Sequence, residues 1–458
     1  MNRTLALIIA LLPFWIMSQR YPPLVDSLLK EYTQEGFGMV ALVSKNGVIE
    51  YKNAFGNANI ELDAQLSPKN KFQIGSITKQ FTAVLILKLE EEGKLQLTDS
   101  IQKYIPEFPN KSNSITIEHL LTHTSGIPEY FDWDKHHEKW DQFYSPSALM
   151  ELIKDEPLDF DPGDAFEYCN SNYLLLGILI ERITGDSYND FLHEEIIDKI
   201  GMNHSSAKYS LYQIDSLALG YTRSNGQIEL ADIEHRSWAY SAGNIISTVD
   251  DINIWYTHLF DGEIISQSTL ERALTPFTLN NGDSIEYGYG WYLERFQGAK
   301  MAYHGGVING FYSYVSFVPK TKTLTVSLAN CECIPFNYIG RKITAYALGK
   351  PLIEKKIIEL DSNLLEMYSG IYKVDKTRNF IVKKKEKHLY GFFEGLPDEG
   401  YNLYASQDGI FFSHDIDSEF EFIVKKYRKI KLQITIPQQN KTPIIRLLSK
   451  IKSAPGSR

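Results

Sequence analysis

The sequence has few cysteines, no internal repeat, no low-complexity stretch and no excess of positive charge. Its formal net charge of −10 disfavours a nucleic-acid partner, because proteins that bind nucleic acids present basic surfaces to the phosphates. The densest basic cluster, VKKKEKH at 382–388, is short and is typical of an exposed strand or turn. No nucleic-acid partner is therefore expected.

Cysteine is scarce, with only Cys169, Cys331 and Cys333 in the chain. Their odd number, and the closeness of the last two in sequence, predict a protein that does not rely on disulfides. The CEC stretch lacks a histidine or further cysteine at ligand spacing, so neither a metal site nor a cofactor is predicted. Several histidines are interpreted as loop or structural residues and not as metal ligands: His119, His123, His136 and His137.

Long apolar runs are absent outside the N-terminus. The segment MNRTLALIIALLPFWIMSQR has a basic start at Arg3, an apolar stretch from Leu5 to Met17 and a small residue at Ser18, which is the layout of a secretory signal peptide at 1–18. Ile16 is not small, so an uncleaved membrane anchor is the alternative, although the run is short for a spanning helix. The sequence predicts export to the periplasm or the extracellular space, with membrane contact only if this segment stays attached.

The length of 458 residues allows two or three domains. We expect a main domain at 19–350. After Pro351 the sequence changes to short aromatic-rich segments separated by turn residues, such as HLYGFFEG and KLQITI, which predict a small β-rich domain at 351–458.

Strands are predicted near both ends of the main domain. Val40–Gly56 reads as a β-hairpin around Asn46 and Gly47, because Asn-Gly is the strongest short hairpin signal. Ala302–Asn330 alternates between apolar and polar residues, turns at Pro319–Thr321 and alternates again, which predicts two strands.

Helices are predicted before, between and after these strands. Tyr21–Gln34 is amphipathic, Phe72–Gly93 contains apolar residues at helical spacing, Asn170–Gly185 is apolar on most sides, and Pro335–Lys350 closes the domain. This arrangement predicts an α+β fold, with an antiparallel sheet built from both ends of the domain, flanked by helices and carrying a helical subdomain.

Ser76 and Lys79 lie in the first turn of the helix within FQIGSITKQFTAVLILKLEEEG, so their side chains point to the same side. A buried apolar helix would hold Lys79 in a partly dehydrated place, where its neutral form becomes accessible. A neutral amine beside a hydroxyl is a base that activates a nucleophile. Taken alone, the pair is a weak indication of catalysis, because a serine at this place is also a common helix cap. In addition, four other serines have a lysine three residues on: Ser27, Ser100, Ser205 and Ser449.

Two further stretches supply candidate partners. Tyr168-Cys169-Asn170 precedes the apolar helix, and HGG at 304–306 lies in the late strand region. With the Ser-x-x-Lys pair, in this order and at about these separations, the chain resembles the serine β-lactamase and penicillin-binding protein superfamily, specifically its class C β-lactamase-like branch, over about 36–350. LTHTSGIP at 121–128 and YSAGNIISTVDD at 240–251 support the resemblance.

The resemblance implies a role for each motif. Ser76 would be the nucleophile that is acylated, and Lys79 and Tyr168 would share the removal of its proton. Tyr168 would also return a proton to the leaving group, with a phenol pKa lowered by cationic neighbours. Asn170 would donate a hydrogen bond to the acyl chain.

The third motif would build the opposite wall of the site. His304 stands where many relatives have a lysine, and the backbone N–H groups of Ser76 and Val307 would form the oxyanion hole. The predicted substrate-binding residues are therefore Asn170, His304, Gly305, Gly306 and Val307.

Two departures from the family pattern bear on the substrate. Gly305 replaces the hydroxyl residue that helps β-lactamases hold a substrate carboxylate, and His304 replaces a fixed cation. An ester or a small D-amino-acid amide is therefore favoured over an antibiotic. Cys169, uncommon at its place, is expected to face away from the substrate.

The prediction is an exported serine hydrolase that acts through an acyl-enzyme on an ester, amide or D-amino-acid peptide substrate. A D,D-carboxypeptidase and a true β-lactamase are the enzymatic alternatives. From another class, the alternative is a non-catalytic cell-wall binding or sensing protein on the same scaffold.

Overall fold

The computed structural model describes residues 21–109, 115–131, 139–208, 215–224, 226–352, 355–374, 379–394, 400–413, 419–425, 429–436 and 444–452. The predicted signal peptide, His136 and His137 lie outside the described residues. The chain forms two compact units, one with the residues up to Phe336 and Gly340–Lys350, the other with Asn337–Ile339 and the residues from Pro351 on. None of the described helices combines the length and the apolar character that a membrane span requires.

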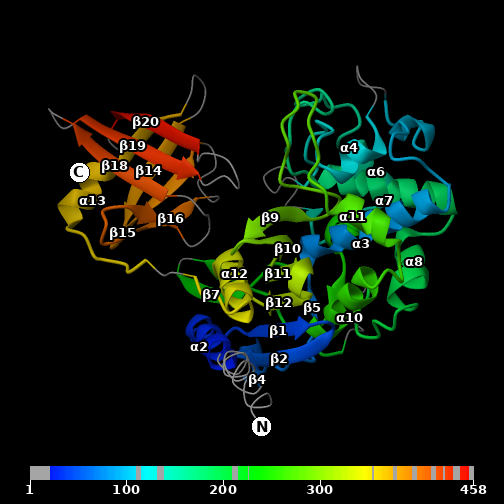
Figure 1. Cartoon of the computed structure of the whole chain (residues 1–458), viewed down its shortest axis with the longest axis horizontal. Coiled ribbons are helices and arrows are strands. Elements are labelled where there is room, and N and C mark those ends of the chain that lie inside the picture. The colour runs from blue at the N-terminus through cyan, green and yellow to red at the C-terminus, as the bar shows by residue number, and fades with distance from the viewer. Residues whose placement is uncertain are drawn as a thin grey trace, which may run out of the picture. The chain divides into compact units, whose positions relative to one another are not determined.

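A six-stranded antiparallel sheet, in the order β2-β1-β12-β11-β10-β9, is the centre of the first unit (Figure 1). Its strands are β1 (Met39–Lys45), β2 (Val48–Phe55), β9 (Tyr292–Phe296), β10 (Ala299–Ile308), β11 (Phe311–Val318) and β12 (Thr323–Ala329). The early strand β1 pairs with the late strand β12, with Val40 opposite Leu328. The predicted α+β class, with a sheet assembled from both ends of the domain, is confirmed.

The turns of this sheet confirm the hairpin predicted around Asn46 and correct the number of strands predicted over Ala302–Asn330. Asn46 and Gly47 both have positive φ, 48° and 75°, as the predicted two-residue hairpin between β1 and β2 requires. The prediction of two strands over Ala302–Asn330 is wrong, because β10 and β11 are separate strands. They are joined at Asn309 and Gly310, a second Asn-Gly turn that the alternation of the flanking residues obscured.

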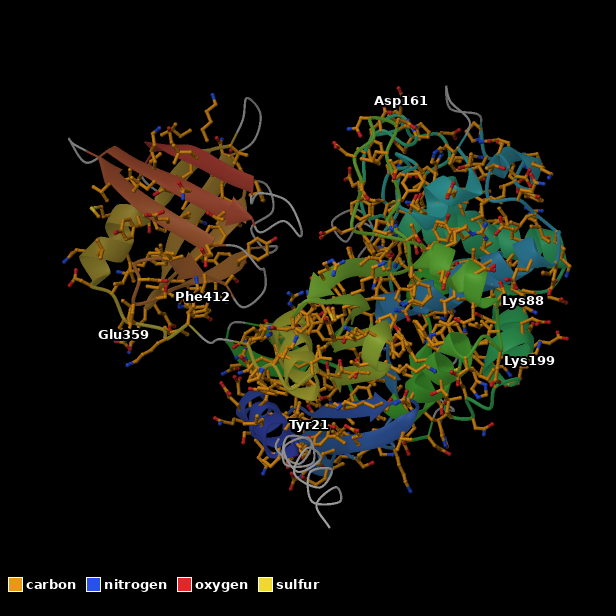
Figure 2. All side chains as sticks on the ribbon, in the orientation of Figure 1. Tyr21, Lys88, Asp161, Lys199, Glu359 and Phe412 are labelled. Carbon is orange, nitrogen blue, oxygen red and sulfur yellow. A yellow bond between two sulfur atoms is a disulfide. The ribbon has the colours of Figure 1, made fainter. Side chains whose placement is uncertain are left out.

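Helices cover both faces of the sheet. The helices of this unit are α2 (Pro22–Tyr32), α3 (Thr78–Glu91), α4 (Ile117–Leu121), α6 (Pro146–Glu151), α7 (Asn170–Thr184), α8 (Tyr188–Leu192), α9 (Tyr240–Gly243), α10 (Val249–Phe260), α11 (Gln267–Ala273) and α12 (Phe336–Ala347). Successive residues of β11 show the two faces, since Ser316 meets Thr344 of α12 at 2.8 Å while the Phe317 ring packs on Phe260 of α10. At the outer edge, Tyr21 (labelled in Figure 2) donates a hydrogen bond from the N-terminus of α2 to Glu50 of β2.

Shorter elements complete the unit. They are the 3₁₀ turns η1 (Gly75–Ile77), η2 (Ile101–Lys103) and η5 (Pro319–Thr321), the π-helical turn η4 (His193–Ile197), and the strand pairs β3 (Asn57–Asn59) with β4 (Ala64–Gln65), β5 (Phe72–Gln73) with β8 (Ile246–Ser247), and β6 (Tyr221–Ser224) with β7 (Gln227–Leu230).

The helix α7 is the centre of the helical subdomain. Its residues from Ser171 to Ile180 are all buried, and it packs against α3, α4, α6, α8 and α9. This agrees with the buried helix predicted from its apolar composition. Because α3 and α7 pack together, their N-terminal ends, which carry Lys79 and Asn170, meet in one place.

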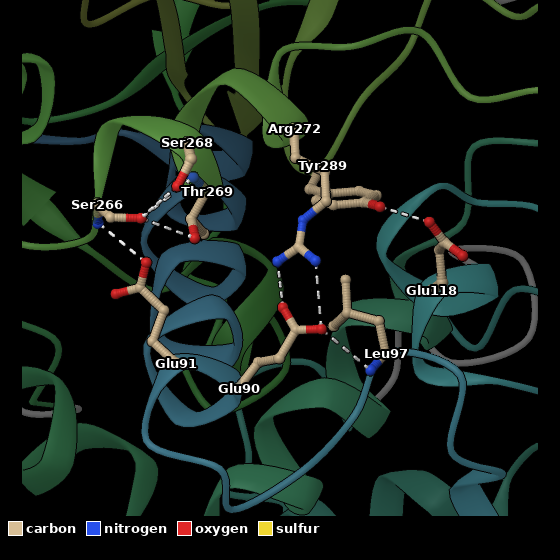
Figure 3. A network of polar contacts seen from close by, with 9 residues as sticks. All are labelled: Glu90, Glu91, Leu97, Glu118, Ser266, Ser268, Thr269, Arg272 and Tyr289. Atoms are coloured by element: carbon tan, nitrogen blue, oxygen red, sulfur yellow. Dashed lines mark hydrogen bonds and ion pairs between the residues drawn. The ribbon is translucent and has the colours of Figure 1, made fainter.

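The far end of α3 is held by a polar network (Figure 3). Glu90 accepts hydrogen bonds from Arg272 of α11 and from the backbone N–H of Leu97, and Glu91 accepts one from the backbone N–H of Ser266 at 3.0 Å. Exposed ion pairs of this kind contribute about 0.2–1 kcal/mol each. The ion pair in this network therefore adds little to the stability of the fold.

The second unit contains a closed eight-stranded barrel, β13 to β20, and the helix α13 (Ser362–Tyr368). The strands are β13 (Gly370–Lys373), β14 (Asn379–Lys385), β15 (His388–Phe393), β16 (Tyr401–Ala405), β17 (Phe411–Phe412), β18 (Glu419–Lys425), β19 (Lys429–Ile436) and β20 (Ile444–Lys452). Aromatic residues such as Phe380, Phe411 and Phe420 fill its core. The predicted C-terminal β-rich domain is confirmed.

The cysteine prediction is wrong, because Cys331 and Cys333 form a disulfide. Their Cα atoms are 5.3 Å apart, within the range that a disulfide bridges. The chain is held at this place by the intervening Glu332, whose N–H donates to the carbonyl of Tyr221 at 3.1 Å. Closeness in sequence thus does not prevent bridging where the backbone beyond a strand end changes direction.

Candidate active site

Ser76 lies in η1, the tight turn that leads into α3. Gly75 before it has a φ of 48°, a conformation that favours glycine. A Cβ atom at Gly75 would lie 2.9 Å from the carbonyl oxygen and 3.0 Å from the nitrogen of Val307. The absence of a side chain at Gly75 therefore lets the Ser76 turn and strand β10 approach backbone to backbone.

Lys79 connects three parts of the site. Its Nζ lies 2.9 Å from Ser76 Oγ, 2.7 Å from Asn170 Oδ1 and 3.0 Å from the carbonyl oxygen of Ala242. Lys79 as a whole is 0% exposed. Burial lowers the pKa of Lys79 to about 7, while the Glu129 carboxylate opposes the shift. The neutral amine is therefore accessible near neutral pH, directly beside the serine hydroxyl.

Tyr168 lies next to this pair. Lys79 Nζ is 4.9 Å from the centre of its ring, and its hydroxyl is buried without a hydrogen-bond partner among the described residues. The hydroxyl is near enough to Ser76 for the serine to favour the ionised phenol, although the contact does not have the geometry of a hydrogen bond.

The expected lowering of the Tyr168 pKa is wrong. Burial raises the pKa of this phenol well above its usual value, and the neighbouring Tyr292 adds to the shift. Its histidine neighbours supply no charge, because burial lowers the pKa of His304 to about 3 and that of His123 well below its usual value. Tyr168 is thus a neutral phenol in this structure.

His304 and His123 pack around Tyr168. The His304 residue is 2% exposed; its Nδ1 contacts the carbonyl of Gly305 at 2.5 Å and its Nε2 contacts the hydroxyl of Tyr287 at 3.2 Å. The His123 ring centre lies 4.4 Å from that of Tyr168, and its Nδ1 accepts the N–H of Cys169. Both side chains are therefore neutral imidazoles.

Strand β10 forms the other side of the site. β9 pairs with β10 only as far as Tyr303, so the edge from His304 to Ile308 has no strand partner on that side among the described residues. Gly306 lies against η1, where a Cβ would be 2.1 Å from the carbonyl oxygen of Ile74, and Val307 is 51% exposed. An open strand edge of this kind can pair with an extended substrate.

Glu129 is a site residue that the sequence reading missed. Its carboxylate accepts the backbone N–H of Asn170 at 2.7 Å and the Asn170 side-chain amide at 3.1 Å. The signal was faint, since Glu129 directly follows the family-like segment 121–128 without belonging to a motif of its own. Asn170 itself is the first residue of α7, and Cys169 turns its thiol toward the carbonyl of Ile127.

The pKa of Lys79 leads to a prediction about pH. We expect kcat/KM to rise with pH through a midpoint near 7, because only the deprotonated Lys79 amine accepts the Ser76 proton. Initial rates from about pH 5 to 9 with one substrate would measure the midpoint. A rate that does not change over this range would contradict the assignment of Lys79 as the base.

The described residues contain no group of three or more histidine, cysteine, aspartate or glutamate side chains arranged to hold a metal ion. The site itself brings together a hydroxyl, an amine and a phenol, from η1, α3 and the segment before α7.

Comparison with known proteins places this geometry in a family. The β-lactamase family model matches residues 25–335. The chain therefore belongs to the β-lactamase family, within the serine hydrolase superfamily of β-lactamases and penicillin-binding proteins, as its three motifs predicted.

Individual relatives agree with this placement. The chain is 28% identical to penicillin-binding protein 4* of Bacillus subtilis over 411 residues, 84% of this chain and 90% of that protein. The octameric penicillin-binding protein homologue from Pyrococcus abyssi has 25% identity and a TM-score of 0.67, covering 94% of this chain and 99% of the other. The D-amino acid amidase from Ochrobactrum anthropi SV3, complexed with D-phenylalanine, shares the fold at 21% identity and a TM-score of 0.62, over 72% of this chain and 98% of the other.

Proposed function

We propose that this protein is an exported serine hydrolase that cleaves amides or esters of small D-amino acids through an acyl-enzyme on Ser76. The observation that carries the proposal is the contact between Lys79 Nζ and Ser76 Oγ at 2.9 Å, in a place where burial makes the neutral amine accessible. Export rests on the composition of residues 1–18.

The proposed reaction has two halves. Ser76 Oγ forms a bond to the substrate carbonyl carbon while its proton moves to the Lys79 amine, and the N–H groups of Ser76 and Val307 stabilise the oxyanion. The bond from the carbonyl carbon to the leaving nitrogen or oxygen then breaks as Tyr168 gives that atom its proton. Tyr168 regains a proton from the Lys79 ammonium, so that no isolated phenolate forms. Water attacks the acyl ester by the reverse route and restores the serine hydroxyl.

The raised pKa of Tyr168 fits this relay. A buried phenol that is hard to ionise is a poor base by itself, but it can pass a proton on when another arrives from Lys79 in the same step. The distance of 4.9 Å between Lys79 Nζ and the Tyr168 ring places the two groups as neighbours.

The charge of the site favours substrates without a free carboxylate. His304 is buried and neutral, and Gly305 has no hydroxyl, so neither supplies the charge-assisted hydrogen bond that best holds a substrate carboxylate. Substrates without a free carboxylate at this position, such as amides and esters, are therefore favoured. The fold shared with a D-amino acid amidase supports the same class.

A D,D-carboxypeptidase is the second candidate, because the chain is similar to a penicillin-binding protein over most of its length. The full-length protein would be incubated with D- and L-phenylalanine amide, p-nitrophenyl esters, nitrocefin and a peptide ending in D-alanyl-D-alanine. We expect turnover of the D-amide or the esters, with a transient acyl group on the Ser76 peptide in mass spectrometry. Preferred cleavage of the D-alanyl peptide would favour the second candidate, and neither turnover nor acylation with any substrate would favour a non-catalytic binding protein.

A further inference from the structure

We propose that Glu129 is a positioning residue, which fixes the amide of Asn170 and, through it, the amine of Lys79. The inference rests on the proposed function of the Ser76 site and names a group that acts without touching the reacting atoms. Three hydrogen bonds hold the carboxylate: from the backbone N–H of Asn170 at 2.7 Å, from its side-chain amide at 3.1 Å and from the backbone N–H of Phe131 at 2.8 Å.

The carboxylate decides which way the Asn170 amide points. A carboxylate only accepts hydrogen bonds, so the NH₂ group of Asn170 must face Glu129. The amide oxygen then faces Lys79 Nζ, at 2.7 Å. The opposite orientation would present two donors to the lysine and remove one of the three contacts that hold its amine.

In this arrangement one hydrogen of the Asn170 NH₂ group is bonded to Glu129, and the amide oxygen accepts from Lys79. Neither Glu129 nor Lys79 binds the second hydrogen of the NH₂ group. We expect this hydrogen to be the donor to the acyl chain of a substrate. Glu129 therefore fixes both the lysine contact and the substrate contact of Asn170.

Glu129 also acts on Lys79 by its charge. The groups that face Lys79 are Glu129, Cys169, Tyr168, Tyr173, His123 and His304. Burial raises the pKa of the thiol and of both phenols and lowers that of both imidazoles, which leaves these groups neutral. Glu129 is the acidic residue among them. Burial raises its pKa as well, but the N–H groups of Asn170 and Phe131 and the charge of Lys79 oppose that shift. Its carboxylate in turn raises the pKa of Lys79 against the effect of burial.

The variant Glu129→Gln tests both effects. Loss of the fixed amide is expected to slow covalent labelling of Ser76 by a fluorophosphonate by about 10- to 100-fold, because small misplacements at a reacting centre have effects of this size. Loss of the charge lowers the pKa of Lys79 further, so the pH midpoint of labelling is expected to move to lower pH. A labelling rate and a midpoint equal to those of the wild type would overturn the proposal.

Two variants serve as controls. Glu167→Gln removes the same charge from an exposed residue next to Tyr168 and is expected to change neither the rate nor the midpoint. Glu129→Asp keeps the charge on a shorter side chain, so we expect slower labelling at the wild-type midpoint. A Glu129→Asp midpoint below that of the wild type would overturn the electrostatic part, and this comparison can be made even if Glu129→Gln fails to fold in thermal denaturation.

Labelling separates this inference from the proposed function. Wild-type protein that is not labelled at Ser76 at any pH would contradict the proposed nucleophile. Wild-type protein that is labelled, with Glu129→Gln labelled equally fast, would contradict only the role of Glu129. A double variant with Asn170→Ala completes the test, because a residue that acts through Asn170 should slow labelling much less in that background.

Discussion

Ser76→Ala is expected to lower kcat for any hydrolysed substrate by about 10⁴- to 10⁶-fold, the loss found when the nucleophile of a serine hydrolase is removed. KM should change little, because the strand edge of β10 and the Asn170 amide remain in place. Lys79 keeps its contacts to Asn170 Oδ1 and the Ala242 carbonyl, so the fold should be retained. Steady-state kinetics and the melting temperature would measure both effects.

The chain offers a matched control for this substitution. Ser27 is also followed by a lysine three residues on, but it lies exposed on α2, where its hydroxyl donates to the Pro23 carbonyl. Ser27→Ala should leave kinetics and labelling unchanged. Turnover or fluorophosphonate labelling that persists in Ser76→Ala would show that another residue is the nucleophile.

Gly306→Ala is expected to have the second-largest effect. An added Cβ would lie 2.1 Å from the Ile74 carbonyl oxygen and 2.2 Å from Ser313 Oγ, so β10 and the Ser76 turn must move apart. Separation of Ser76 from Val307 opens the proposed oxyanion hole, and we expect kcat to fall by about 10²-fold or more. Overpacking of this kind also costs about 1–3 kcal/mol of unfolding free energy.

Gly298→Ala separates the kinetic effect from the loss of stability. Gly298 lies in the turn between β9 and β10 with a φ of 82° and open space where a Cβ would stand. Alanine there is strained and should cost about 1 kcal/mol of stability, with kcat retained. If Gly306→Ala kept wild-type kcat, the close approach of β10 to the Ser76 turn would not be needed for catalysis.

The sequence predicted the α+β fold class, and its motifs named residues that lie close together in the structure. Ser76 and Lys79 are one turn apart on one helix, so local geometry alone brings them together. Their convergence with Tyr168 was implied by a resemblance and not by spacing, and the packing of α3 on α7 produces it. The sequence analysis missed Glu129 because it contacts Asn170, which lies 41 residues further along the chain. No local sequence pattern predicts a contact over that separation.

Of the two expected pKa shifts, that of Lys79 followed from local sequence and that of Tyr168 depended on the tertiary structure. The lowered pKa of Lys79 followed from the apolar helix that carries it. The pKa of Tyr168 was expected to fall and instead rises, because burial outweighs the effect of the neighbouring Ser76 hydroxyl. Burial is a property of the assembled structure, and the residues next to Tyr168 in sequence do not reveal it.

The amino-acid sequence by itself determined the negative net charge, the hairpin at Asn46, the buried helix α7 and the three short motifs. The last three depend on residues within a few positions of one another. Packing alone decided which way the Asn170 amide faces, whether Tyr168 carries a proton, and how closely Gly306 approaches the Ile74 carbonyl. These outcomes depend on groups brought from distant parts of the chain into a buried space, where the groups that lie opposite set the charge and the direction of each hydrogen bond.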